Sequence, residues 1–139
     1  MFAVILPHSI QAFFDEYAAA FNALDGDAVA RLYAVPAGIV DAGGSTHWPD
    51  FEAIRANMVA LCRLYRDDGF VWARFAPSAH IAQGEIFAVA DVAWTIELDG
   101  GRPPKIFNTT YNLMRVGPAW RVLLCTAYGE PKLKQAPLA

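Results

Sequence analysis

A single carboxylate, Asp41, ends the apolar run at residues 31–41 and is followed by Ala42 and two glycines. An aspartate ahead of glycines is an ordinary way to end a strand, because its side chain bonds to nearby backbone N–H groups in the turn. A carboxylate also serves as a general base when a partly dry site raises its pKa toward the working pH. Two interpretations of Asp41 are therefore open: a turn residue, or a base at the bottom of a pocket.

Tyr17 is the second candidate, because it lies in the middle of an apolar helical stripe beside Phe13, Phe14 and Phe21. A buried phenol needs a hydrogen-bond partner, and an unpaired hydroxyl costs about 1–3 kcal/mol. The stripe by itself favours a core tyrosine that is bonded to a backbone carbonyl.

The segment at residues 105–116, KIFNTTYNLMRV, holds a third group of candidates in two alternating rows. One row is aromatic and apolar (Phe107, Tyr111 and Leu113), and the other is polar (Asn108, Thr110 and Asn112). Only one row can face the interior, because a shift of one residue turns every side chain of a strand to the other face. In one register the aromatic row packs in the core and the polar row is solvated. In the other, on which the candidate site depends and which we therefore expect, the polar row faces a cavity, where amides and a hydroxyl bind a ligand, and the aromatic row faces a partner subunit.

Three helices are predicted to position these residues. The first begins at Ser9 as the cap and runs to about Ala23, and a short second helix covers residues 27–33. The third begins at Pro49 and ends at Gly69. The buried faces are expected to carry Ile10, Phe13, Phe14, Tyr17, Phe21 and Leu24 in the first helix and Phe51, Ile54, Met58, Leu61, Cys62 and Tyr65 in the third.

After residue 70 the hydrophobic period changes to two, which predicts four antiparallel strands at residues 70–81, 84–98, 105–116 and 120–130. A short strand at residues 38–41 and a loop at 42–48 precede them, and the tail at 131–139 is expected to be loose. Pro77 should interrupt its strand. The row expected to face outward from the strand at 84–98 is Val89, Asp91, Ala93, Thr95 and Glu97.

Helices followed by an antiparallel meander predict one α+β domain over residues 1–139, with the helices on one face of the sheet. A strongly twisted sheet can curl around its helices and leave a cone-shaped cavity between the two layers.

Several spacings in the chain resemble those of the steroid Δ-isomerases and the SnoaL-like polyketide cyclases of the nuclear-transport-factor-like superfamily. Tyr17 stands sixteen residues before Tyr33 in the segment LDGDAVARLYA, and Asp41 stands eight residues after Tyr33. The segment NLMRVGPAWRVLLCTAYGE matches the closing hairpin of that family and places Asn112 where the isomerases have an aspartic acid. The resemblance spans nearly the whole chain, with insertions in the middle.

This resemblance implies three helices packed in the concave face of a curved, mostly antiparallel sheet, a cone-shaped cystatin-like α+β roll. It implies that Asp41 is a general base that moves a proton next to a carbonyl, while Tyr17 and Asn112 donate hydrogen bonds to the developing enolate oxygen. Preorganised donors of this kind are worth roughly 3–4 kcal/mol each. The amide of Asn112 donates less strongly than a neutral carboxylic acid. The side chains expected to line the pocket are Trp48, Ile54, Met58, Leu61, Trp94, Ile96, Asn108, Thr110 and Met114.

The composition narrows the classes of partner. Hydrophobic residues make up 55% of the chain, charged residues 18%, and the net charge is −3 without a basic cluster. Nucleic acid and anionic membranes are therefore not expected partners. The apolar excess predicts a second buried surface, either a cavity for a small apolar molecule or a homodimer interface on the outer face of the sheet. Cys62 and Cys125 are predicted to be small core residues in a reducing compartment, the cytoplasm.

No cofactor or metal is predicted, because neither His47 nor His80 has a second histidine at ligand spacing with a carboxylate. His47 is expected to be a solvated loop residue, with a proton shuttle as the alternative, and His80 to be structural.

Three functions are open. The first is a cofactor-free isomerase, cyclase or dehydratase acting on an apolar carbonyl compound. The second is a non-catalytic binding module, in which Asp41 is exposed or paired with Arg31 or Arg55. The third is a dimerisation domain with a filled cone.

Overall fold

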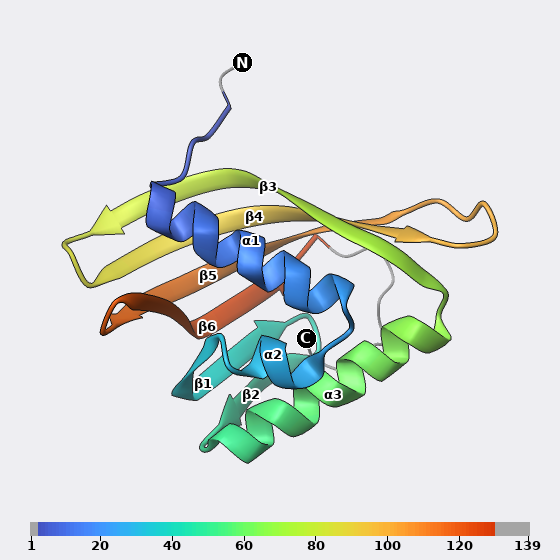
Figure 1. Ribbon diagram of the computed structural model, residues 1–139, viewed down its shortest axis with the longest axis horizontal. Helices are drawn as coiled ribbons and strands as arrows, with labels where there is room; N and C mark the ends of the chain where they lie inside the picture. The colour runs from blue at the N-terminus through green and yellow to red at the C-terminus, as the bar shows by residue number, and fades with distance from the viewer. Residues whose placement is uncertain (1–2, 130–139) are drawn as a thin grey trace.

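The computed structural model describes residues 3–129, in which three helices cover one face of a curved sheet (Figure 1). The helices are α1 (His8–Asn22), α2 (Gly26–Ala30) and α3 (Phe51–Asp67). The strands are β1 (Tyr33–Asp41), β2 (Gly44–Trp48), β3 (Phe70–Gln83), β4 (Phe87–Leu98), β5 (Lys105–Val116) and β6 (Ala119–Tyr128). The expected α+β roll is confirmed.

The sheet has six strands in the order β2-β1-β6-β5-β4-β3. The four long strands form the predicted antiparallel meander, and β1 pairs in parallel with β6. The prediction of a loop at residues 42–48 is wrong: β1 starts at Tyr33 and turns into β2 to form a hairpin. The tail at 131–139 lies outside the described residues. The bulge expected at Pro77 is confirmed as a register shift between Pro77 and Ala79.

The helix boundaries differ from prediction mainly at the caps. Pro7, not Ser9, precedes α1, and the Ser9 hydroxyl instead accepts a hydrogen bond from the Trp120 indole N–H at 3.0 Å. The caps of α2 and α3 are Asp25 and Asp50, whose carboxylates accept from backbone N–H groups three residues later. These aspartates satisfy N–H groups that have no partner inside the helix.

The inner face of the sheet packs against the aromatic stripe of α1. The expected buried faces of both long helices are confirmed except at two ends, where Leu24 is half-buried and Phe51 is exposed. Both cysteines are free and buried, as predicted.

The register expected for β5 is wrong. Phe107, Tyr111 and Leu113 are buried, whereas the row of Asn108, Thr110 and Asn112 lies on the outer face. Two contacts explain this register. Tyr111 packs against α1 with its ring centroid 5.0 Å from that of Phe14, and Thr110 lies directly opposite Asp91 on β4. Because Asp91 faces outward, as predicted, its cross-strand neighbours must face outward as well.

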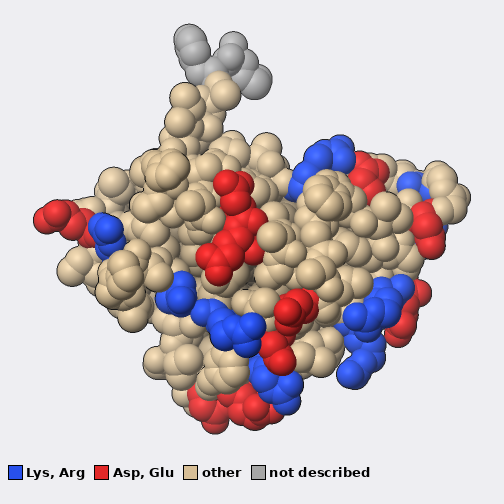
Figure 2. All heavy atoms as spheres, in the orientation of Figure 1, with Lys and Arg blue, Asp and Glu red and all other residues tan. Residues whose placement is uncertain are grey.

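Charged side chains of both signs are interspersed on the face of the molecule shown in Figure 2. Among residues 3–129, no helix has both the length and the apolar character needed to cross a bilayer.

The close crossing of α2 and α3 depends on Gly26. A Cβ added there would lie 2.6 Å from the backbone N and Cα of Val59, closer than real Cβ contacts. We predict that Gly26→Ala lowers the free energy of unfolding by about 1–3 kcal/mol, because the helices would have to separate. Helix propensity alone predicts the opposite sign, a gain of up to about 1 kcal/mol. Urea unfolding distinguishes the two, and a more stable variant would contradict the close-contact explanation.

Candidate functional site: a phenol-lined cone

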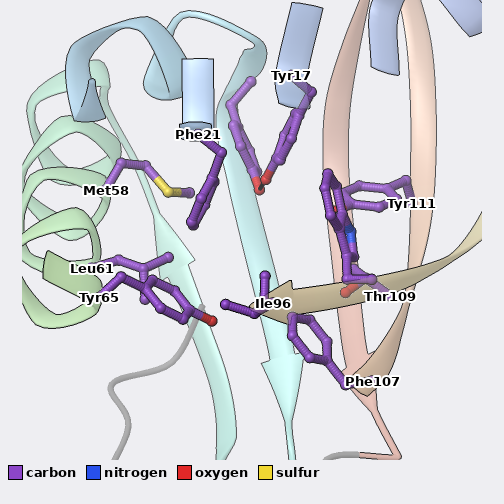
Figure 3. A pocket seen from close by; sticks show the side chains of 11 residues that line it. Tyr17, Phe21, Met58, Leu61, Tyr65, Ile96, Phe107, Thr109 and Tyr111 are labelled. Carbon is purple, nitrogen blue, oxygen red and sulfur yellow. Dashed lines mark hydrogen bonds between the residues drawn. The ribbon is translucent and has the colours of Figure 1, made fainter. Parts of the chain in front are cut away.

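A pocket opens between α1, α3 and the inner face of the sheet. Figure 3 shows Met58, Leu61 and Tyr65 of α3 on one side and Phe107, Thr109 and Tyr111 of β5 on the other. The full lining consists of Tyr17, Phe21, Tyr33, Met58, Leu61, Tyr65, Trp94, Ile96, Phe107, Thr109 and Tyr111. All of these side chains are neutral at pH 7, so the pocket is apolar apart from a few hydroxyl groups.

Three buried tyrosines meet at the closed end of this pocket. The hydroxyls of Tyr17 and Tyr33 lie 2.8 Å apart, and the ring centroids of Tyr17 and Tyr111 lie 5.5 Å apart. The Trp94 indole N–H donates to the Tyr111 hydroxyl at 2.9 Å, and the Tyr33 hydroxyl contacts the Cys125 Sγ at 3.6 Å. The hydroxyl of Tyr17 is therefore paired with a phenol from a distant strand, Tyr33, and not with the expected backbone carbonyl.

One arrangement of these bonds leaves a proton for a ligand. An indole N–H can only donate, so Tyr111 accepts from Trp94. Either oxygen of the Tyr17–Tyr33 pair can be the donor, and Tyr33 donates to Tyr17 when the Cys125 thiol donates to Tyr33. The Tyr17 oxygen then accepts from Tyr33, and its proton is free to point into the pocket. An oxygen that accepts hydrogen bonds becomes a stronger donor, because neighbouring bonds polarise one another.

Burial governs the ionisation of this cluster. Loss of hydration raises the pKa of Tyr17, Tyr33 and Tyr111 well above the ordinary value of 10.0, and it raises the pKa of Cys125 to about 12. The neighbouring phenols of Tyr33 and Tyr111 offset part of this rise in the pKa of Tyr17, because polar neighbours stabilise a phenolate better than an apolar core does. All four groups are therefore neutral hydrogen-bonding groups at physiological pH.

Two sets of contacts near the cluster fix the position of α1. The Asn22 side chain donates to the Ala73 carbonyl at 2.9 Å and accepts from the Ala73 N–H at 2.7 Å, which ties the end of α1 to β3. The Tyr17 ring packs between Phe21, at 6.4 Å, and Tyr111, at 5.5 Å between ring centroids. Tyr17 is therefore held in place by packing as well as by its hydrogen bonds.

Asp41 lies at the β1–β2 hairpin and is not among the residues that line the pocket. Its carboxylate accepts a hydrogen bond from the Gly43 N–H at 2.7 Å, which is the geometry of an Asx turn. The turn interpretation of Asp41 is the one that the geometry supports.

The other candidates are distributed over three regions. Tyr17, Met58, Leu61, Trp94 and Ile96 line the pocket. Trp48 and Ile54 belong to the buried core beside the pocket. The outer face of β5 carries Asn108, Thr110, Asn112 and Met114. The structure therefore does not bring Asn112 to Tyr17. Of the two candidate histidines, His47 is exposed on β2, and His80 has a buried Nε2 with no hydrogen-bond partner among the described residues.

The main residues missed by sequence reasoning are Tyr33, Tyr111 and Thr109. The signal for Tyr111 was the plain alternation of β5, which buries Phe107 and Leu113 on the same face. No three His, Cys, Asp or Glu side chains gather as a metal-binding group in the part of the chain that the structure describes.

Comparison with known proteins establishes the family of this chain. Residues 8–130 match the model of a family described as NTF2-like protein (DUF6841). The chain belongs to this family. It is thus a member of the NTF2-like superfamily, as the sequence resemblance implied. A search of curated proteins finds no match.

Solved structures share the fold at low identity. A cystatin-like domain of unknown function from Nostoc punctiforme is 16% identical, with a TM-score of 0.70 over 91% of this chain and 78% of that one. A ketosteroid isomerase-like protein from Erwinia carotovora atroseptica is 14% identical, with a TM-score of 0.66 over 86% and 92%. An NTF2-like protein of unknown function from Shewanella oneidensis is 14% identical, with a TM-score of 0.67 over 86% and 95%. At these identities the likeness is one of fold alone.

The buried phenols predict how the protein responds to base. A pKa raised by folding means that stability is complete below the unfolded value, near pH 10.0, and is lost as the pH rises above it. We expect tyrosinate absorbance from Tyr17, Tyr33 and Tyr111 to appear only together with the loss of circular dichroism. The variant Tyr128→Phe removes an exposed phenol and should leave the unfolding step unchanged. Ionisation of three phenols in a folded protein would contradict the buried network.

Proposed function

We propose that this NTF2-like protein binds a small, largely apolar molecule in the cone and holds one oxygen atom of it with the Tyr17 hydroxyl. The observation that carries this proposal is the phenol cluster: the Tyr33 hydroxyl lies 2.8 Å from the Tyr17 oxygen, and when Tyr33 donates, the Tyr17 proton is left for an acceptor. A buried polar group that finds its partner only when a ligand binds is a source of specificity, because ligands that lack the acceptor leave it unpaired.

The shape of the pocket limits the ligand. Its enclosed space is only about 30 Å³, although the space between atoms reaches about 410 Å³ when the opening to solvent is included. A molecule of ten or more heavy atoms therefore binds only if some of the lining side chains move. Apolar walls with a few convergent polar groups are typical of small-molecule sites.

Proton transfer next to a carbonyl, the reaction implied by the resemblance to isomerases, stays a prediction. The donor that it requires is present in Tyr17, and a ketosteroid isomerase-like protein shares the fold. The base that it requires is not among the eleven residues that line the pocket. A pocket with a donor but no acid or base supports binding and polarisation of a carbonyl better than turnover.

A matched pair of probes tests the proposal. We expect the protein to bind 2-acetylnaphthalene about tenfold more tightly than 2-ethylnaphthalene, because one hydrogen bond in a dry site is worth about 1–1.5 kcal/mol. The variant Tyr17→Phe should bind both probes equally, with the affinity of the hydrocarbon unchanged. Titration followed by NMR chemical shifts measures all four dissociation constants.

Two control variants sharpen this test. Tyr128→Phe, which alters a phenol on the outer face, and Asp41→Asn should both retain the tenfold preference. The proposal fails if neither probe binds, or if the preference survives in Tyr17→Phe. The same samples test the isomerase-type function, through the exchange of the acetyl protons of 2-acetylnaphthalene with deuterium. If the protein accelerates this exchange and Asp41→Asn does not, the result supports that function, with Asp41 as the base.

The outer face of the sheet supports a second proposal, that two copies of the chain pair through it. Exposed apolar side chains on this face include Ile106, at 55% exposure, and Leu124, at 36%. The Asp91 carboxylate, on the same face of β4, accepts hydrogen bonds from Asn108, Thr110 and Tyr128, so its charge is already solvated by neutral donors. Four strands of this length cover a plane of about 750 Å², close to the roughly 800 Å² per partner of a stable interface.

Substitution of Ile106 tests this pairing. We expect the protein to sediment as a dimer and Ile106→Asp to sediment as a monomer, because a charge at a paired apolar position would be buried without a partner. Leu64→Asp places the same charge at an exposed position of α3, away from the sheet, and should remain dimeric. A monomeric parent protein at high concentration would overturn the proposal.

A further inference from the structure

A lysine lies at the open end of the pocket. Lys105 is on the inner face of β5, two residues before Phe107 and directly opposite Ile96, and both of these residues line the pocket. Its Nζ donates to the Asp68 carboxylate at 2.8 Å, and Asp68 follows the lining residue Tyr65 by three positions. The Lys105 side chain therefore crosses the rim of the cone between β5 and the end of α3.

The Lys105 ammonium can form further hydrogen bonds besides the one to Asp68. An ammonium has three N–H donors, and Asp68 accepts one of them. The other carboxylate oxygen of Asp68 pairs with Arg102 at 3.2 Å, and Arg102 also pairs with Asp99 at 3.1 Å, so Asp68 is shared by two cations while Asp99 contacts Arg102 only. The Lys105 side chain keeps 32% of its surface exposed at the mouth of the pocket. An anion there could bind without displacing Asp68.

We infer that the ligand carries an anionic group, such as a carboxylate, at the end that remains at the rim, and that Lys105 selects for it. This inference rests on the proposed function, because it assigns the outer end of the same ligand. The neutral, phenol-lined interior takes the apolar body of the molecule. The charged group stays at the rim, where it keeps part of its hydration and gains a charge-assisted hydrogen bond.

The spacing along β5 also sets the shape of the ligand. Tyr111 at the closed end and Lys105 at the rim are six residues apart, which is about 20 Å of strand. The distance that a ligand must bridge is shorter than this, because the side chains of Lys105 and Tyr17 each cover part of it. A molecule that reaches both is elongated, with an apolar chain or ring system between its polar ends. Arylalkanoic and medium-chain acids have this form.

A competition experiment separates this inference from the function on which it rests. The neutral fluorescent probe N-phenyl-1-naphthylamine reports occupancy of the pocket. The acid 5-phenylpentanoate and its methyl ester then compete with it, and they differ only in the charge at one end. We expect the acid to compete about five- to tenfold more strongly than the ester at low salt, with a smaller ratio at high salt because the charge is screened.

The variant Lys105→Met keeps the aliphatic stem and removes the charge. It should bind the neutral probe as the parent protein does and reduce the acid-to-ester ratio to about one. Arg63→Met removes one positive charge from an exposed position of α3 and should keep the ratio of the parent protein. Thermal unfolding of each variant verifies that it is folded.

Each outcome has a distinct meaning. Equal competition by acid and ester in the parent protein, or a ratio that survives in Lys105→Met, overturns the inference and leaves the pocket function intact. A ratio that falls equally in Arg63→Met overturns it as well, because the effect would then come from net charge. Failure of the neutral probe and of both competitors to bind overturns the proposed function and the inference together.

Discussion

The hydroxyl of Tyr17 must be satisfied inside an aromatic core, and this requirement organises the centre of the molecule. Its ring lies within the apolar stripe of α1, where no backbone group is free to bond, because a helix uses its own N–H and C=O groups internally. The hydrogen-bond partner comes instead from Tyr33 on β1, and the ring of Tyr111 on β5 packs edge-on against that of Tyr17. An unpaired phenol would destabilise an apolar core, whereas the paired and packed Tyr17 connects α1 to two strands.

The same arrangement makes the pocket chemically asymmetric. Its closed end holds hydroxyl groups that are neutral over the physiological range, because burial raises their pKa. Its rim carries the charged pair of Lys105 and Asp68. Moving from rim to closed end, a ligand would lose water gradually and meet its strongest hydrogen-bond donor in the driest place, where such a bond has the greatest effect. Asp41, at a solvent-accessible turn, takes no part in this gradient.

The elements were predictable where a local pattern decides them. The helical stripe containing Phe14, the bulge at Pro77 and the strands after residue 70 follow from spacing and from the backbone limits of proline. The register of β5 was mispredicted, although the outward position of Asp91 was predicted and implied it: Thr110 lies opposite Asp91, so the polar row had to share the outer face. The outward position of Asp91 on the neighbouring strand predicted the register of β5 better than the function expected for Asn112 did.

Local patterns were enough to predict the fold class, the buried face of each long helix and the apolar setting of Tyr17, because these depend on periodicities of two and 3.6 residues that can be read from a short stretch of chain. The three-dimensional packing was needed to find which hydroxyl meets Tyr17, that Asp41 bonds within its own turn, and that Lys105 crosses the rim. The surroundings of Tyr17 include contacts between residues up to 94 positions apart, as between Tyr17 and Tyr111. Such contacts are set by strand order and sheet curvature, which local spacing does not encode.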